Sequence, residues 1–248
     1  MVKKLQKQRQ WKIEKTEIEN LWNQAKKLKP ALKAKGCDLP FYDFLDSYET
    51  EFNRLVAWAK ETCPSLHGVF EISNGDFDSE TDWGRLGLPA DWMQVFFVCD
   101  DETATSYTAR DSSANLRGAA TGFHDPSGRF HTVIEVIKNP ECKWEHKEYK
   151  YAFKLPILLH EIGHVRDYEN KGHFNPELKT ADLIEGEVYA HLFALDECFR
   201  RAYFTSGVMY LDSLMDYKDS SDYRGEVVRR LLSRFNKPEY KQWLDYDL

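Results

Sequence analysis

The stretch LPILLHEIGHVRDYE, residues 155–169, carries two histidines and a glutamate at its centre, among leucines and isoleucines. An imidazole or carboxylate that leaves water without a partner costs several kcal/mol, so an apolar helix normally excludes such groups. On a helix, His160 and His164 lie one turn apart on the same face, with Glu161 beside them. Two neutral imidazole nitrogens at this spacing can bind a divalent metal ion, which would compensate for their burial.

A metal ion on this face would bring a defined chemistry. It lowers the pKa of a bound water molecule to about 7 and polarises a carbonyl group. A carboxylate next to the first histidine can take the proton from that water, and Glu161 holds this position. The motif therefore predicts metal-assisted hydrolysis. A catalytic zinc needs three protein ligands and one open position, so a third ligand must come from elsewhere in the chain.

The helix that carries the histidines must bury its other side. Pro156 stands where a first-turn proline opens a helix, which predicts a helix over residues 155–170. Apolar residues that fall opposite the histidines can form its buried face: Leu155, Leu158, Ile162 and Val165. The same kind of periodicity predicts further helices over residues 181–204, 207–217 and 223–235.

The HExxH motif of residues 160–164 resembles that of the zincin metallopeptidases. This resemblance implies a Zn²⁺ ion held by His160 and His164, with Glu161 as the general base. In the gluzincin branch, which includes thermolysin-like enzymes, a glutamate on a later helix is the third zinc ligand. The stretch EGEVYAHLFAL, residues 185–195, is similar to the ExxA(D/N) pattern of that branch. The implied third ligand is Glu187, and His191 stands where an acidic or amide residue is usual.

Helical geometry supports Glu187 independently of the family. Glu187 shares one face of its predicted helix with Ala190 and Ala194, whose small side chains let this helix approach the histidine helix closely. Glu185 points about 160° away from Glu187 on an ideal helix, so both cannot serve. Two alternatives for the third ligand remain, His191 and Asp182. Either residue could instead contact a ligand without binding the metal itself.

The region before the motif changes to a strand pattern. Apolar and β-branched residues predict strands near residues 68–72, 93–99, 105–109 and 129–137, separated by turn-rich pieces. They indicate a small, mostly antiparallel sheet, followed by a helical half that carries the HExxH helix. In zincins the substrate lies antiparallel to an edge strand just upstream of the motif, and residues 129–137 occupy that position here.

The first 62 residues predict a helical N-terminal extension. Apolar residues recur at helical spacing from Ile18 to Leu32, and a second such series from Phe41 to Ala59 is ended by Cys63 and Pro64. The sequence therefore predicts an α+β fold in two parts, an extension over residues 1–62 and a zincin-like peptidase domain over residues 63–248.

Composition and cysteine spacing limit the class of protein and the cell compartment that the sequence predicts. The chain has 248 residues, 42% of them hydrophobic, and no apolar run approaches the roughly 18 residues of a membrane span. Its five cysteines are widely spaced and form no CxxC pair, which favours free thiols and the cytoplasm. No contact with a membrane is expected.

Charge is distributed unevenly along the chain. Residues 1–36 hold 11 Lys and Arg against 3 Glu, a net charge of +8, whereas the whole chain carries −7. Such a segment suits an acidic partner or the protein's own acidic surface, while the lack of a recognisable module argues against nucleic acid. The leading hypothesis is a zinc metallopeptidase acting on a protein or peptide substrate. The alternative is a non-catalytic zincin-like module whose basic first helix docks on an acidic partner or nucleic acid.

Overall fold

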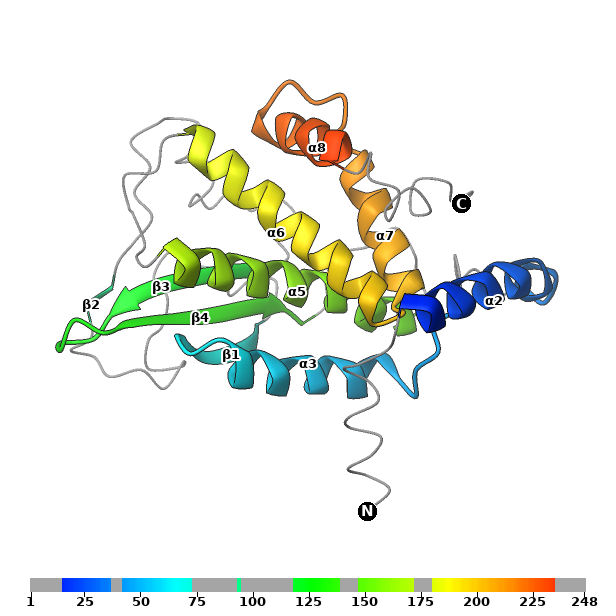
Figure 1. The fold of residues 1–248 in the computed structure, drawn as a ribbon, viewed down its shortest axis with the longest axis horizontal. Coiled ribbons are helices and arrows are strands. Elements are labelled where there is room, and N and C mark those ends of the chain that lie inside the picture. The colour runs from blue at the N-terminus through cyan, green and yellow to red at the C-terminus, as the bar shows by residue number, and fades with distance from the viewer. Residues whose placement is uncertain are drawn as a thin grey trace, which may run out of the picture. The chain divides into compact units, whose positions relative to one another are not determined.

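The computed structural model describes residues 15–36, 42–72, 93–94, 118–138, 147–171 and 180–234. Its helices are α2 (Lys15–Ala34), α3 (Tyr48–Thr62), α5 (Lys147–Lys171), α6 (Thr180–Arg200), α7 (Phe204–Met215) and α8 (Tyr223–Arg234). Its strands are β1 (Leu66–Ile72), β2 (Met93–Gln94), β3 (Gly118–His124) and β4 (Phe130–Ile137), as Figure 1 shows. The predicted α+β class, with a sheet followed by a helical half, is confirmed.

The strands form one mixed sheet in the order β1-β4-β3-β2. Strands β3 and β4 are antiparallel, as are β2 and β3, whereas β1 and β4 are parallel. The expectation that residues 129–137 form an edge strand was wrong, because β4 lies between β1 and β3. Its residues from Thr132 to Ile137 are all buried, which suits the near-continuous Thr, Val and Ile sequence of an interior strand.

Strand β3 takes the position near the edge. No strand was predicted over Gly118–His124, because glycine and alanine have low strand propensity. Pairing with β4 supplies the missing stabilisation, with Gly118 opposite Val136 and Gly122 opposite Thr132. Of the strands predicted over residues 93–99 and 105–109, only Met93–Gln94 appears, as β2; the others lie outside the described residues.

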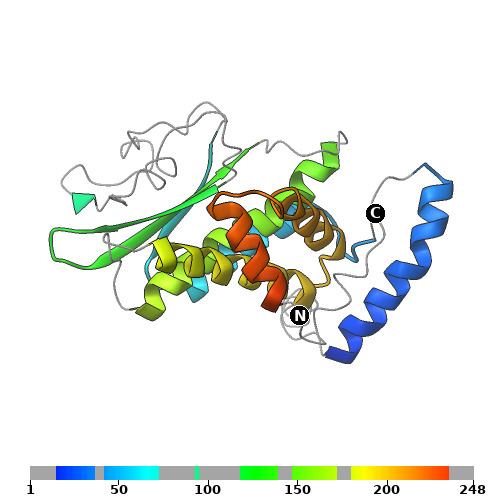
Figure 2. The same ribbon diagram turned by 90° about the horizontal axis from the view of Figure 1, so that it is seen from above.

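The chain divides into two compact units, one made of Tyr48–His191 and the other of Met1–Ser47 with Leu192–Leu248. In the first unit, α5 packs against β3 and β4 and lies alongside them (Figure 1 and Figure 2). Helix α3 packs against α5 and β1. The boundaries between these units fall after Ser47 and after His191.

Helix α5 begins earlier than predicted. It starts at Lys147, so Pro156 lies inside the helix and not in its first turn. An interior proline costs about 3 kcal/mol because it removes a backbone hydrogen bond. Burial of Ala152, Phe153 and Leu155 in the same stretch offsets this cost, since each fully buried large apolar side chain contributes roughly 1.5 to 3 kcal/mol. The predicted apolar face is confirmed, because Leu158 and Val165 are 0% exposed.

The second unit is helical where it is described. Helix α2 packs through Ile18, Trp22 and Ala25, and the Trp22 ring meets Phe204 edge to face with centroids 5.0 Å apart. The helix predicted over residues 181–204 ends at Arg200, because Ala202 takes a positive φ of 57° and begins a C-terminal cap before α7. Within the described residues, none of the helices is long and apolar enough to cross a membrane.

Candidate metal centre

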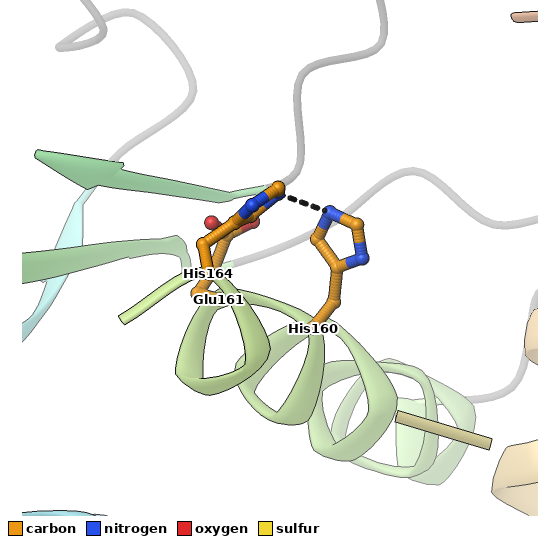
Figure 3. Close-up of side chains that lie close together, drawn as sticks. All are labelled: His160, Glu161 and His164. Atoms are coloured by element: carbon orange, nitrogen blue, oxygen red, sulfur yellow. Dashed lines mark hydrogen bonds between the residues drawn. The ribbon is translucent and has the colours of Figure 1, made fainter. Parts of the chain in front are cut away.

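The histidines of the motif converge on one point beside α5. Both come from the same helix face, and their Nε2 atoms lie 3.1 Å apart with the rings nearly perpendicular, as Figure 3 shows. The apolar residues on the opposite face fix the helix against its neighbours, so the pair cannot turn toward bulk water without losing that burial. Two imidazole nitrogens that face each other at this distance suit a shared positive ion.

Glu187 reaches the same point from α6. One of its oxygens, Oε2, lies 3.4 Å from His160 Nε2, and the other, Oε1, lies 3.3 Å from His164 Nε2. The side chain is buried, and its α6 neighbours Ile184, Val188 and Ala190 are buried as well. The structure thus brings together the two histidines and the glutamate that the sequence placed 23 residues beyond His164.

A glycine inside the motif allows this meeting. A Cβ added to Gly163 would lie 2.9 Å from the Cα of Ala190, closer than real side chains approach. Gly163 and Ala190 therefore let α5 and α6 touch through their backbones, one turn of α6 from Glu187. The sequence predicts this close approach from Ala190 and Ala194, without Gly163.

The donor set fits a zinc ion. Zinc bonds to imidazole nitrogen and carboxylate oxygen are about 2.0–2.1 Å long, so two ligands of a tetrahedral ion lie about 3.3–3.4 Å apart. The two imidazole nitrogens are 3.1 Å apart, and each lies 3.3 or 3.4 Å from a different oxygen of Glu187, which is close to this value. Two imidazoles and one carboxylate are also a donor combination that zinc prefers.

Glu161 lies between the histidines and β3. Its side chain is 5% exposed, and one of its oxygens lies within 4.8 Å of donor nitrogens of both histidines. A Cβ added to Gly118, the first residue of β3, would fall 2.7 Å from Glu161 Oε1, so the carboxylate rests against the strand backbone. Burial raises the pKa of Glu161, and the nearby histidines oppose this shift.

The charges of the cluster are strongly coupled. Burial disfavours the charged form of His164, but Glu187 outweighs burial and raises the pKa of His164 to about 9. Burial likewise opposes the charge of Glu187, yet His164 and His160 hold the pKa of that carboxyl well below its usual range. Without a metal ion, Glu187 is therefore ionised at neutral pH, as a ligand must be.

Of the two remaining predicted residues, one lies in the cluster and the other lies outside it. His191 joins the cluster, with Nε2 3.9 Å from Glu187 Oε2 and its ring 4.3 Å from that of His160. Asp182 is exposed in the first turn of α6 and does not belong to either group of clustered donors found in the described residues. Tyr168, which the sequence analysis missed, lies parallel to His164 at a centroid distance of 6.2 Å. Its position four residues after His164 could have indicated it.

A second polar cluster holds the end of α5. Glu169 Oε1 accepts hydrogen bonds from the backbone N–H of Ser65 at 2.9 Å and from Ser65 Oγ at 2.6 Å. Ser65 Oγ also lies 3.1 Å from Thr132 Oγ1, and the Thr132 N–H donates to the Ser65 carbonyl. These bonds join α5 to the start of β1 and to β4, and so fix the helix that carries the histidines.

Comparisons with known proteins do not assign the chain to a family. Family models, curated proteins and solved structures each give no match. Any function assigned to this chain therefore rests on its own residues and their geometry.

Proposed function

We propose that this chain is a zinc-dependent metallopeptidase of the gluzincin type. His160, His164 and Glu187 are the zinc ligands, and Glu161 is the general base. The observation that carries the proposal is the convergence of two imidazole nitrogens, 3.1 Å apart, with the Glu187 carboxylate, next to a buried second carboxylate. One Glu187 oxygen lies 3.4 Å from His160 Nε2, and the other lies 3.3 Å from His164 Nε2. A histidine pair that served only to fill a core would not require two carboxylates beside it.

Zinc held by these three side chains would supply a Lewis acid that polarises a carbonyl group and lowers the pKa of a water molecule to about 7. Glu161 takes one proton from the attacking water as the new carbon–oxygen bond forms. It then gives that proton to the departing nitrogen as the carbon–nitrogen bond breaks. The raised pKa of Glu161 suits this role, because a base whose pKa lies nearer neutrality accepts a proton more readily.

The substrate backbone would lie along β3. Among the described residues, β2 pairs only with Phe123 and His124, so no described strand covers Gly118–Gly122 on the side away from β4. An extended peptide can add to such an edge by main-chain hydrogen bonds. Glu161 lies against the first residue of this edge, so a peptide bond held there would be within reach of the proposed base.

A reducing, cytoplasmic location is part of the proposal. Cys63 and Cys198 are both buried and free, and thiols that remain unpaired are usual in reducing compartments.

The test compares Glu161→Gln with His164→Ala. For each protein we would measure bound metal by elemental analysis and hydrolysis of a mixed peptide library by mass spectrometry. Glu161→Gln should retain the metal and lose about 10²- to 10⁴-fold in hydrolysis, the usual contribution of a general base. His164→Ala should lose both the metal and hydrolysis, because it removes a ligand.

Asp182→Asn is the matched control, since it neutralises an exposed carboxylate outside the cluster. It should leave metal content and hydrolysis unchanged. A Glu161→Gln protein that hydrolyses the library as fast as the wild type would refute the peptidase proposal.

A further inference from the structure

We propose that His191 is a fourth protein ligand of the metal ion, so that three imidazoles and Glu187 surround it. This inference rests on the metal centre proposed above, but it assigns to His191 a role that the gluzincin pattern does not contain. That pattern has an acidic or amide residue at this position, which offers no imidazole donor.

His191 belongs to the cluster by position. It follows Glu187 by one turn of α6, so both side chains leave the helix on the same face. Its side chain is 12% exposed, against 11% for His160, 12% for His164 and 9% for Glu187. The four groups are therefore equally enclosed, whereas a histidine at the rim of the site would be more exposed than the ligands.

The distances allow His191 to share the ion. Two donors bonded to one ion at about 2.1 Å cannot be more than about 4.2 Å apart, even on opposite sides of it. His191 Nε2 lies 3.9 Å from Glu187 Oε2, inside this limit. Donor atoms of His160, Glu187 and His191 all lie within 4.8 Å of one another, and these three side chains could hold one metal ion.

The same distances argue against a simpler role. At 3.9 Å, His191 Nε2 is too far from Glu187 Oε2 for the hydrogen bond by which a neighbour would orient that carboxylate. Its ring lies over that of His160, tilted by 35°, with the ring centroids 4.3 Å apart. An experiment must therefore separate ligation by His191 from packing of its ring on His160.

A fourth protein ligand has a consequence for catalysis. A four-coordinate zinc with four protein ligands has no position for water, which is the arrangement of structural sites. Hydrolysis would then require His191 to leave the ion, or the ion to accept a fifth ligand. The resting centre would be closed, and substrate or a change in the protein would have to open it.

The test replaces His191 by phenylalanine, which keeps an aromatic ring over His160 and removes both ring nitrogens. His67→Phe is the control, because His67 is an exposed histidine of the same unit. The zinc-loaded proteins are compared by X-ray absorption, which counts bound imidazoles, and by competition with a chromophoric chelator. Cobalt-substituted proteins are compared by their visible spectra, which depend on the number and type of ligands.

The wild type and His67→Phe should show three bound imidazoles, and His191→Phe should show two. The cobalt spectrum of His191→Phe should also change, and its zinc affinity should fall by more than about 10-fold. An unchanged imidazole count and cobalt spectrum in His191→Phe would overturn the inference, whatever the affinity. His191→Gln provides a second variant if His191→Phe does not fold.

Failure of this inference can be told apart from failure of the proposed function. Wild-type protein that binds no zinc contradicts both. Zinc bound through two imidazoles, with Glu161→Gln inactive, contradicts only the role of His191. Zinc bound through three imidazoles, with Glu161→Gln as active as the wild type, supports the role of His191 and contradicts only the peptidase.

Discussion

Helix α5 carries two clusters of buried polar side chains that differ in how their charges are satisfied. In the cluster around Glu169, one carboxylate oxygen accepts two hydrogen bonds from Ser65, and Ser65 continues to Thr132. Donors and acceptors alternate there. In the cluster around Glu187, two imidazole nitrogens face each other at 3.1 Å and two carboxylates lie close by, so four side chains that can each bind a metal ion gather in one place.

Under the function proposed above, the cluster around Glu169 stabilises the fold and the cluster around Glu187 binds the metal ion. Buried polar groups that donate and accept in sequence are complete by themselves and serve the fold. Buried groups that gather several potential metal ligands in one place gain stability from an ion bound there. The first cluster would then be unaffected by metal, and the second would depend on it.

Removing the metal should have the largest effect of the changes considered, because it should destabilise the cluster around Glu187 and not the cluster around Glu169. A ligand present at about 1,000 times its dissociation constant stabilises a protein by about 4 kcal/mol. Treatment with a chelator should therefore lower the melting temperature of the wild type, measured by circular dichroism. The same treatment should not shift the melting temperature of His164→Ala. A wild-type protein with identical melting curves in chelator and in zinc would remove the distinction between the clusters.

The size of the metal effect should increase with pH. In the metal-free protein, the raised pKa of His164, about 9 against 6.5, means that its ion pair with Glu187 stabilises the fold fully below 6.5. That contribution is lost as the pH rises through about 9. Zinc needs the neutral imidazole, so protons compete with it at low pH. The difference in melting temperature between zinc-loaded and chelated protein should grow from pH 6.5 toward pH 9.

Gly118→Ala should affect catalysis next most strongly. The added methyl group would fall 2.7 Å from Glu161 Oε1 and 2.9 Å from its Cγ, so the carboxylate must move away from β3. A misplacement of about 1 Å in a reacting group can cost about 10²-fold in rate. Hydrolysis of the peptide library should fall by this order while bound zinc, measured by elemental analysis, stays constant. Parallel loss of zinc would show that Gly118 holds the ligands and not the base.

Gly163→Ala should separate the ligands from one another. The methyl group would clash with the backbone of Ala190, and such overpacking costs about 1–3 kcal/mol. We expect a lower free energy of unfolding in urea and weaker zinc binding, because α6 carries Glu187 away from the histidines. Gly186→Ala is the control: its methyl group would meet only Asp167 Oδ2 at 3.7 Å, so helix propensity should leave it up to about 1 kcal/mol more stable.

Ser65→Ala should have the smallest effect and should spare the metal. It removes the hydroxyl that donates to Glu169, but the backbone N–H of Ser65 still donates to the same oxygen. The expected loss of stability is about 1 kcal/mol, measured by urea unfolding. Zinc affinity should match that of the wild type. A clear loss of zinc affinity in Ser65→Ala would mean that the two clusters are coupled through α5.

Several features of the fold follow from local sequence. The one-turn spacing of His160 and His164 and the apolar residues opposite them depend only on helix geometry, so both could be predicted. Strand β3 could not be predicted, because its glycines and alanines favour a strand only when β4 is beside them. The start of α5 was also predicted wrongly. A proline indicates the first turn of a helix only where burial of other side chains does not offset the free-energy cost of an interior proline.

For the candidate site, the sequence alone determined which residue types share a helix face: the two histidines with Glu161 on α5, and Glu187 with His191 on α6. The tertiary structure decided which of these faces meet and how closely. It set Gly163 against Ala190, Glu161 against Gly118 and the Glu187 carboxylate against both imidazoles. These contacts join residues far apart in the chain, and their distances depend on the packing of whole elements, which no local pattern encodes.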